Sequence, residues 1–364
     1  MSRFARERRV FFIEEPIYGA GESELVTKTC PQTGVHVVTP HLVSHANQNQ
    51  VLEELIAEFI SSNSIQKPIL WFYTPMALGS FPSSISTSAV IYDCMDELSM
   101  FRGAPPGLRD YEQQLFNLAD LVFTGGVSLC EAKRDSHPSV HAFPSGVDFE
   151  HFAQARALAH QSRKRRDLPG LRLGYAGVID ERLDLPLLDE VAGKKPEWQF
   201  VMIGPTAKIS PDSLPRRENI HWLGMKDYSE LPEYFAGWDV GMMPFALNDA
   251  TRFISPTKTP EYLSAGLPVV STAIRDVVNP YGKLGLAWIA SDADEFIRGS
   301  ELAASAREDQ SWQERADTFL QGCSWDAVWE GMSRHVMSVR TPARPMRSPV
   351  STVNYEIQEQ IASV

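Results

Sequence analysis

The chain has 364 residues, 43% of them hydrophobic and 22% charged, which is typical of a globular protein and excludes a largely disordered or fibrous one. At roughly 150 residues per domain, this length predicts two lobes. The 34 Lys and Arg against 46 Asp and Glu give a net charge of -12, the wrong sign for covering a polyanion, so nucleic acid is not expected as a partner.

Cysteine usage and hydropathy indicate where the protein works. The four cysteines have no C-x-x-C spacing, which argues against a disulfide framework and a zinc site. No run approaches the 18 apolar residues of a membrane span, and no signal-peptide pattern follows the arginines at the start. These features predict a cytoplasmic protein.

Short apolar runs alternate with helical patterns over residues 1–150. The helical patterns cover residues 50–61 and 108–119. Alternation of strand and helix predicts a parallel sheet, so residues 1–150 are expected to form one Rossmann-like domain. The expected strands cover residues 10–13, 35–39, 69–73, 89–92, 121–124 and 140–144.

A change of composition follows. Residues 151–170 hold a basic run at 163–166 and few large apolar residues, which predicts an exposed linker whose basic run is a solvated surface. The strand and helix alternation then restarts and predicts a second Rossmann-like domain over 171–323. Its expected strands cover residues 171–176, 199–203, 219–223, 239–244, 267–271 and 286–289.

Two segments remain at the end of the chain. Residues 324–340 carry apolar side chains at helical spacing and predict one amphipathic helix. Three prolines within 341–350 oppose regular structure, so residues 341–364 are expected to be a flexible tail.

The strongest chemical signal lies in the second lobe. Ser255 and Thr257 are residue types that begin helices, which predicts free backbone N–H groups suited to an anion. Lys258 adds a positive charge there, and Glu261 follows one turn later on the same face. A carboxylate can accept hydrogen bonds from the two hydroxyls of a ribose. The alternative is an ordinary helix start with an internal Lys258–Glu261 pair.

Three weaker patterns occur elsewhere in the chain. Gly177 and Arg182 follow the first strand of the second lobe, where a glycine admits a diphosphate and an arginine can clamp it; a tight turn with a surface arginine is the alternative. Asp93, Asp96 and Glu97 end a buried strand and are candidates for an acceptor site or a general base, unless they merely complement a helix dipole. Asp292-Ala-Asp294 has the spacing of a metal-binding signature, but Ser291 and Asp294 fit a capping box at a helix start better.

Two segments together resemble a known family. The pattern Ser255-Pro-Thr-Lys-x-x-Glu261-Tyr-x-x-x-Gly266-x-Pro-Val-Val-Ser-Thr272, preceded by Trp238 to Phe245, resembles the nucleotide-sugar half of bacterial GT-B glycosyltransferases of the group 1 or family 4 type. Phe143-Pro-Ser-Gly146-Val147-Asp148 is similar to the end of their acceptor domain. The resemblance implies an α/β GT-B fold: two Rossmann-like, doubly wound parallel-sheet domains facing each other across a cleft.

The resemblance also implies an activity. Such enzymes transfer a sugar from a nucleoside diphosphate sugar, the co-substrate, to a saccharide or lipid-linked acceptor of the cell envelope, with no bound metal or cofactor. Glu261 would hold the ribose. The diphosphate would be held by Ser255, Thr257 and the helix start, with Lys258 and Arg182, whose positive charge replaces that of a metal. Asp93 or Asp96 would face the acceptor, and helix 324–340 would cross back to the first lobe.

Two departures from the family pattern leave alternatives open. Phe253 stands where members have a first glutamate that touches the donor sugar, which leaves the donor and the stereochemical outcome undecided. Residues 1–9 are similar to a helix that members place after a first strand, so that strand is expected to be missing. A nucleotide-sugar 2-epimerase and a truncated, weakly active homologue are therefore alternatives. A periplasmic-type binding protein is disfavoured.

The arginines near the start could also bring the protein to a membrane. Arg3, Arg6, Arg8 and Arg9 could contact an anionic surface as a peripheral patch at the inner face of the membrane, although an amphipathic core helix is the simpler interpretation.

Overall fold

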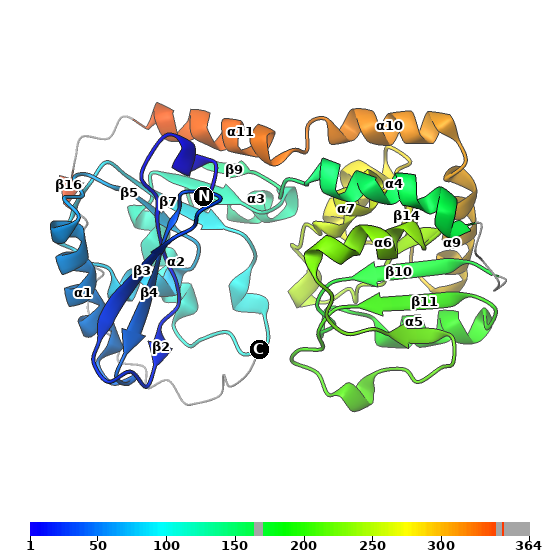
Figure 1. Ribbon diagram of the computed structural model, residues 1–364, viewed down its shortest axis with the longest axis horizontal. Helices are drawn as coiled ribbons and strands as arrows, with labels where there is room; N and C mark the ends of the chain where they lie inside the picture. Colours follow the sequence, from blue (N-terminus) through cyan, green and yellow to red (C-terminus); the bar gives the residue numbers. More distant parts are fainter. Residues whose placement is uncertain (164–169, 340–343, 346–364) are drawn as a thin grey trace.

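The computed structural model describes residues 1–163, 170–339 and 344–345, which form two lobes lying side by side (Figure 1). Each lobe buries its own apolar core. In the view of Figure 1, α11 lies along the top of the first lobe and α10 along the top of the second. No helix in the described ranges is long and apolar enough to cross a membrane.

One sheet of the first lobe is entirely parallel, with strand order β5-β7-β8-β9. Helices α2 (Leu108–Leu118) and α3 (Val127–Lys133) make its crossovers. β7 and β8 are buried along their whole length, so they are continuous apolar runs, as central parallel strands usually are. The four strands are β5 (Ile69–Phe72), β7 (Ala89–Cys94), β8 (Leu121–Thr124) and β9 (Val140–Ala142).

The remaining strands of the first lobe form a separate mixed sheet rather than extending the parallel one. β1 (Phe11–Ile13) and β2 (Ile17–Tyr18) run parallel to β4 (His36–Leu42), and β3 (Glu24–Thr29) runs antiparallel to it. β3 and β2 were not predicted. The connection from β3 to β4 is too short for a crossover, which makes an antiparallel pair the only possible one. Helix α1 (Gln48–Ser62) follows β4.

The second lobe contains one parallel sheet with strand order β12-β11-β10-β13-β14-β15. All six strands overlap the predicted ones. They are β10 (Arg172–Ala176), β11 (Gln199–Ile203), β12 (Ile220–Trp222), β13 (Val240–Met243), β14 (Val269–Thr272) and β15 (Ala287–Ala290). Its helices include α5 (Leu185–Lys194), α6 (Leu231–Ala236), α7 (Lys258–Ser264), α8 (Arg275–Val277), α9 (Ala293–Ala306) and α10 (Gln310–Leu320).

Several short turns of helix connect these elements. The expected helix over residues 1–9 is reduced to one 3-10 turn, η1 (Phe4–Arg6). The others are η2 (Pro75–Ser80), η3 (Leu98–Met100), η4 (Pro211–Ser213), η5 (Tyr228–Glu230), η6 (Asp249–Thr251) and a π turn, η7 (Val278–Gly282).

The predicted linker over 151–170 is wrong for most of its length. Residues 149–163 form a helix, α4 (Phe149–Arg163). Phe152, Ala155 and Ala159 are buried in the core of the second lobe, to which this helix therefore belongs. Alanine carries little hydrophobic signal in a sequence, but its small size lets α4 lie close to α6 and α7. Residues 164–169, most of the basic run, lie outside the described ranges.

Helix α11 (Trp325–Ser338) returns to the first lobe. Ser324 caps it through the Ala327 N–H, and Val336 packs with Ile91 and Phe123 beneath the parallel sheet. Of the expected tail, 341–364, only Arg344–Pro345 lies within the described part. This pair forms β16 and runs antiparallel to β6 (Ser86–Thr87).

The first residues of the chain pack against α11. Arg3 and Arg6 donate to the Asp326 carboxylate, and the Phe4 ring lies 5.4 Å from that of Trp71. Arg9 donates to the carbonyl of Asn63 at 3.1 Å, so three of the four arginines considered for a membrane patch are engaged within the molecule.

Gly174 offers a test of the second-lobe packing. A β-carbon on this β10 residue would lie 1.9 Å from the ring of Trp238, which is itself buried. We expect Gly174→Ala to lower the free energy of unfolding by about 1–3 kcal/mol or more, because the core must shift to admit the methyl group. Chemical denaturation measures this effect, and Gly21→Ala, at an exposed site with open space around it, is the control.

Candidate functional site

The candidate donor residues lie at the carboxyl ends of the second-lobe strands, the edge at which open parallel sheets bind ligands. Gly177 and Arg182 follow β10, and α7 follows β13. A cavity of about 370 Å³ opens nearby between α3 of the first lobe and the chain after β14.

Helix α7 begins later than predicted. Its first residue is Lys258, and Thr257 occupies the N-cap position without a capping side-chain hydrogen bond. Ser255 therefore does not cap the helix, and it lies instead against Gly126 of the first lobe. With seven residues, α7 has a small dipole, so the charge offered to an anion comes mainly from side chains.

Lys258 and Glu261 lie on this helix, and each affects the pKa of the other. Burial raises the pKa of Glu261 to about 7, although the Lys258 charge and the Thr257 hydroxyl both act to lower it. Burial likewise lowers the pKa of Lys258, against the pull of Glu261. No ion pair among the described residues joins the two, so each remains available to a ligand.

Gly177 makes room for Lys258. A β-carbon at this position would lie 2.3 Å from Cε of Lys258, and the backbone φ of +153° is one that L-residues rarely adopt. The Lys258 ammonium lies 5.3 Å from the centre of the Tyr175 ring, at the end of β10. The glycine predicted to admit a diphosphate thus directly borders the lysine predicted to bind it.

Arg182 is held in place by Asp180. Its Nε and Nη2 donate to the buried Asp180 carboxylate at 2.9 and 2.7 Å, and this pairing raises the arginine pKa. The guanidinium carbon lies 5.9 Å from the centre of the Phe101 ring of the first lobe, and Lys208 Nζ lies 5.5 Å from the same ring. Arg182 therefore sits where the two lobes face each other.

The two candidate catalytic carboxylates, Asp93 and Asp96, have different surroundings. Asp93 is 4% exposed; its Oδ2 accepts from Trp71 Nε1 at 3.0 Å, and its Oδ1 has no hydrogen-bond partner. Burial raises the Asp93 pKa to about 6. Burial also raises the pKa of Asp96, and the positive charge of Arg182 opposes that rise. Of the two carboxylates, Asp96 is the one whose pKa is affected by a charged group of the second lobe.

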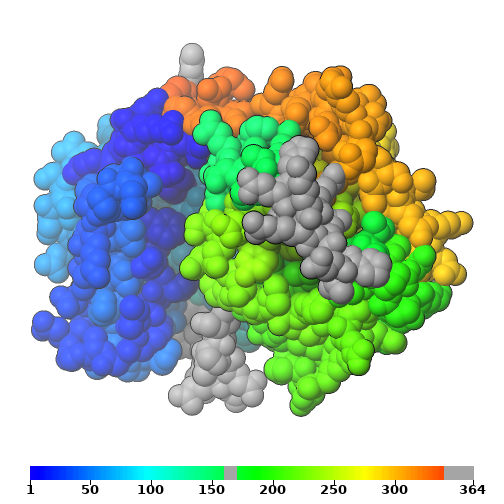
Figure 2. Space-filling model, turned by 45° about the vertical axis from the view of Figure 1, so that its right-hand side comes forward, coloured from blue at the N-terminus to red at the C-terminus, as the bar shows by residue number. Residues whose placement is uncertain are grey.

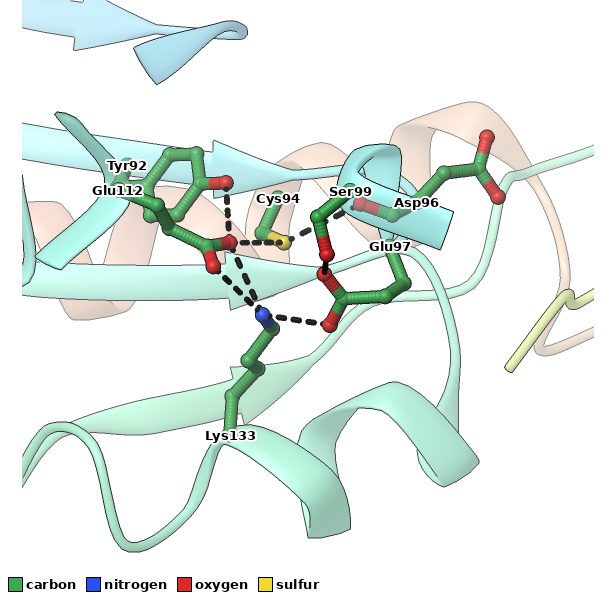
Figure 3. A network of polar contacts seen from close by, with 7 residues as sticks. All are labelled: Tyr92, Cys94, Asp96, Glu97, Ser99, Glu112 and Lys133. Atoms are coloured by element: carbon green, nitrogen blue, oxygen red, sulfur yellow. Dashed lines mark hydrogen bonds and ion pairs between the residues drawn. The ribbon is translucent and has the colours of Figure 1, made fainter. Parts of the chain in front are cut away.

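Glu97, the third acid of this strand end, belongs to an internal network (Figure 3). Lys133 binds Glu97 at 2.6 Å and Glu112 at 2.8 Å, and Tyr92 donates to Glu112 at 2.9 Å. In Figure 3 the Asp96 side chain points away from this network. Lys133 thus secures the segment after β7 from one side and leaves Asp96 free on the other.

Arg156 was missed by the sequence analysis because it lies in the segment predicted as a linker. From α4 its guanidinium donates to the carbonyls of Ser264 at 2.7 Å and Leu263 at 3.1 Å, and it pairs with Asp317 of α10. Arg156 thereby binds carbonyl groups at the carboxyl end of α7 and connects this helix to α4 and α10.

The Asp-x-Asp motif has a capping role. Asp292 accepts from the Glu295 N–H at 2.8 Å and is the N-cap of α9, whereas Asp294 pairs with Lys194. Ser291 donates to Glu295, so the capping residues differ from the Ser291 and Asp294 that were predicted. Within the described residues, no group of three His, Cys, Asp or Glu side chains could hold a metal ion.

Comparison with known proteins supports the fold and indicates the family that this chain resembles. Residues 181–301 match the family model described as glycosyl transferases group 1. The chain is 26% identical over 286 residues to TuaH of Bacillus subtilis (strain 168), assigned as a glycosyltransferase of teichuronic acid biosynthesis; the match covers 73% of this chain and 71% of TuaH. The chain is a glycosyltransferase, and it resembles those of group 1.

Solved structures with low sequence identity share the fold of this transferase. Sucrose-phosphate synthase from Thermosynechococcus elongatus superposes with a TM-score of 0.67 at 13% identity, covering 92% of this chain and 90% of that one. HepE from Anabaena, solved in complex with UDP and glucose, has a TM-score of 0.60 at 13% identity over 85% and 88% of the two chains. The predicted α/β GT-B architecture is confirmed.

Proposed function

We propose that this transferase moves a sugar from a UDP-sugar to a polysaccharide or glycolipid acceptor of the cell envelope without a bound metal. The observation that carries the proposal is the convergence of Lys258, Glu261 and Arg182 at one edge of the second-lobe sheet. Two similar proteins support this choice of substrates: HepE was solved with UDP and glucose, and the name of TuaH places it in teichuronic acid biosynthesis.

The charges of the second lobe suit a nucleoside diphosphate. Glu261 would accept hydrogen bonds from the ribose hydroxyls. Lys258 and Arg182 would face the diphosphate, together with the backbone at Ser255 and Thr257. Because negative charge develops on the diphosphate as the sugar leaves, fixed cations at this place stabilise the transition state more than the bound substrate.

Asp96 is the first-lobe carboxylate proposed to face the acceptor, since it interacts with Arg182 across the gap between the lobes. We expect Asp96→Asn to lower the turnover of the donor by about 10²–10⁴-fold if the carboxylate takes the proton of the acceptor hydroxyl. UDP affinity should stay the same, because the nucleotide contacts lie in the second lobe. Turnover assays paired with calorimetric UDP titration measure both quantities, and an equal loss of both would contradict the assignment.

A nucleotide panel tests the proposal as a whole. UDP and UDP-glucose, with GDP and dTDP for comparison, would be titrated calorimetrically into the full chain in the presence of EDTA. The proposal expects binding of the uridine compounds without a metal. Binding of none, or binding that needs Mg²⁺, would contradict it.

Product analysis separates the two enzyme classes left open above. Formation of a second UDP-sugar without any acceptor would identify a 2-epimerase, whereas a transferase releases UDP.

We place the reaction in the cytoplasm, because all four cysteines are free thiols and thiols persist in a reducing compartment.

A further inference from the structure

A carboxylate of the second lobe is bonded directly to the backbone of the first. Asp276, in α8 after β14, accepts from the Val127 N–H at 2.9 Å and the Ser128 N–H at 3.0 Å, both in the first turn of α3. The side chain is 5% exposed, so these two hydrogen bonds take the place of its water contacts. The three residues join parts of the chain that lie almost 150 positions apart.

Gly126 lies in close contact with the second lobe. A β-carbon there would be 2.3 Å from Oδ2 of Asp276 and 2.7 Å from Cβ of Ser255. The backbone of Gly126 is extended, with φ of -162° and ψ of 166°, so any residue could adopt it. Glycine is therefore required here because second-lobe atoms occupy the space that a β-carbon would take, and not because of the backbone conformation.

Two further contacts flank this point. Phe253 of the second lobe packs against the first-lobe core that includes Phe72 and Leu129. Arg275, next to Asp276, pairs with Glu131 on α3. The interface therefore combines a buried carboxylate, a close backbone approach, an aromatic contact and an ion pair.

These contacts connect the donor helix to the acceptor-side carboxylate. Ser255, which presses on Gly126, lies three residues before Lys258 of α7. The neighbouring Gly125 receives equally close contact within the first lobe, where a β-carbon would lie 2.3 Å from the carbonyl oxygen of Met95, the residue before Asp96. A continuous path of packed backbone thus runs from α7 through Gly126 to Asp96.

We infer that Asp276, Gly126 and Phe253 form a latch between the lobes that positions Asp96 against the donor site, and that Asp276 is a positioning residue for transfer. This inference builds on the proposed function. The donor residues, Ser255 among them, all lie in the second lobe, so binding of the nucleotide does not need the Asp276 hydrogen bonds to the first lobe, whereas transfer does. Figure 2 shows the blue first lobe directly beside the green second lobe with α11 above them.

Gly126→Ala is the first test, because the atoms nearest to its methyl group belong to the second lobe. Hydrogen exchange of the backbone amides at 127–133, read by mass spectrometry, should speed up by about tenfold or more as the Asp276 hydrogen bonds open. Small-angle scattering should show a larger radius of gyration. Release of UDP from UDP-glucose should slow by about tenfold or more.

Two other variants accompany it. Asp276→Ala removes the carboxylate without adding bulk against Ser255. It should give the same exchange and turnover changes while the Kd for UDP stays within about twofold. Gly21→Ala adds a methyl group at an exposed first-lobe site with open space and should match the wild type in every measurement.

The outcomes separate the latch from the proposed function. Unchanged exchange and turnover in Gly126→Ala would overturn the latch, as would a UDP affinity that falls in parallel with turnover in Asp276→Ala. If the wild type binds no UDP, the proposed function fails, and the exchange and scattering data alone decide on the latch.

Discussion

Glu261→Ala is expected to weaken the binding of UDP-glucose by about 10–100-fold, because hydrogen bonds to a charged group contribute about 1.5–3 kcal/mol. The fold should survive, since the change removes a half-buried carboxylate whose ionisation burial already disfavours. Calorimetric titration measures the affinity. Glu330→Ala on α11 removes one carboxylate from the other lobe and serves as the control.

The pKa of Glu261 also predicts how binding changes with pH. Because burial raises this pKa to about 7, the carboxyl is largely protonated at pH 6 and ionised at pH 8. An ionised carboxylate accepts hydroxyl hydrogen bonds more strongly, so UDP-glucose affinity should rise across this range. UDP-glucose is the suitable probe because free UDP has a terminal phosphate that itself titrates near pH 6. The rise should vanish in Glu261→Gln, and a rise that persists there would assign the titration to another group.

Lys258→Met is expected to lower turnover by about 10²–10³-fold with a smaller loss of UDP affinity, because the positive charge matters most when the diphosphate leaves. Methionine keeps much of the length of the side chain against Gly177 and Tyr175 without the charge. Stability should stay the same or rise, since burial already lowers the pKa of Lys258.

The control for this variant is Lys194→Met, which removes a lysine from α5 that pairs only with surface acids. UDP release is followed at saturating UDP-glucose, and affinity by calorimetry. Wild-type turnover in Lys258→Met would contradict the proposed role of the lysine. A loss of affinity as large as the loss of turnover would show that the lysine serves binding alone.

Local sequence features determined most of the second lobe and the identity of its candidate donor residues. Strands such as β11 and β13 are short apolar runs bounded by polar residues, a pattern that a buried parallel strand needs and few other elements share. The helix and the candidate donor residues in the segment from Ser255 to Thr272 could also be predicted, because its Pro, Lys, Glu and Gly residues each restrict the local backbone or carry charge. The GT-B family could therefore be recognised before any contact was known.

Only the tertiary structure decided where the lobes divide and how they touch. Helix α4 has alanines in place of large apolar residues, so its membership of the second lobe depends on how closely α6 and α7 approach it. Arg156 acts on carbonyls more than 100 residues away, and Asp276 on amides almost 150 residues away. Secondary-structure propensity and hydrophobic periodicity depend on residues that are neighbours along the chain. They therefore cannot predict a hydrogen bond between segments that are distant in the sequence. The sequence by itself thus determined the candidate donor residues, whereas the fold in three dimensions decided which first-lobe groups face them.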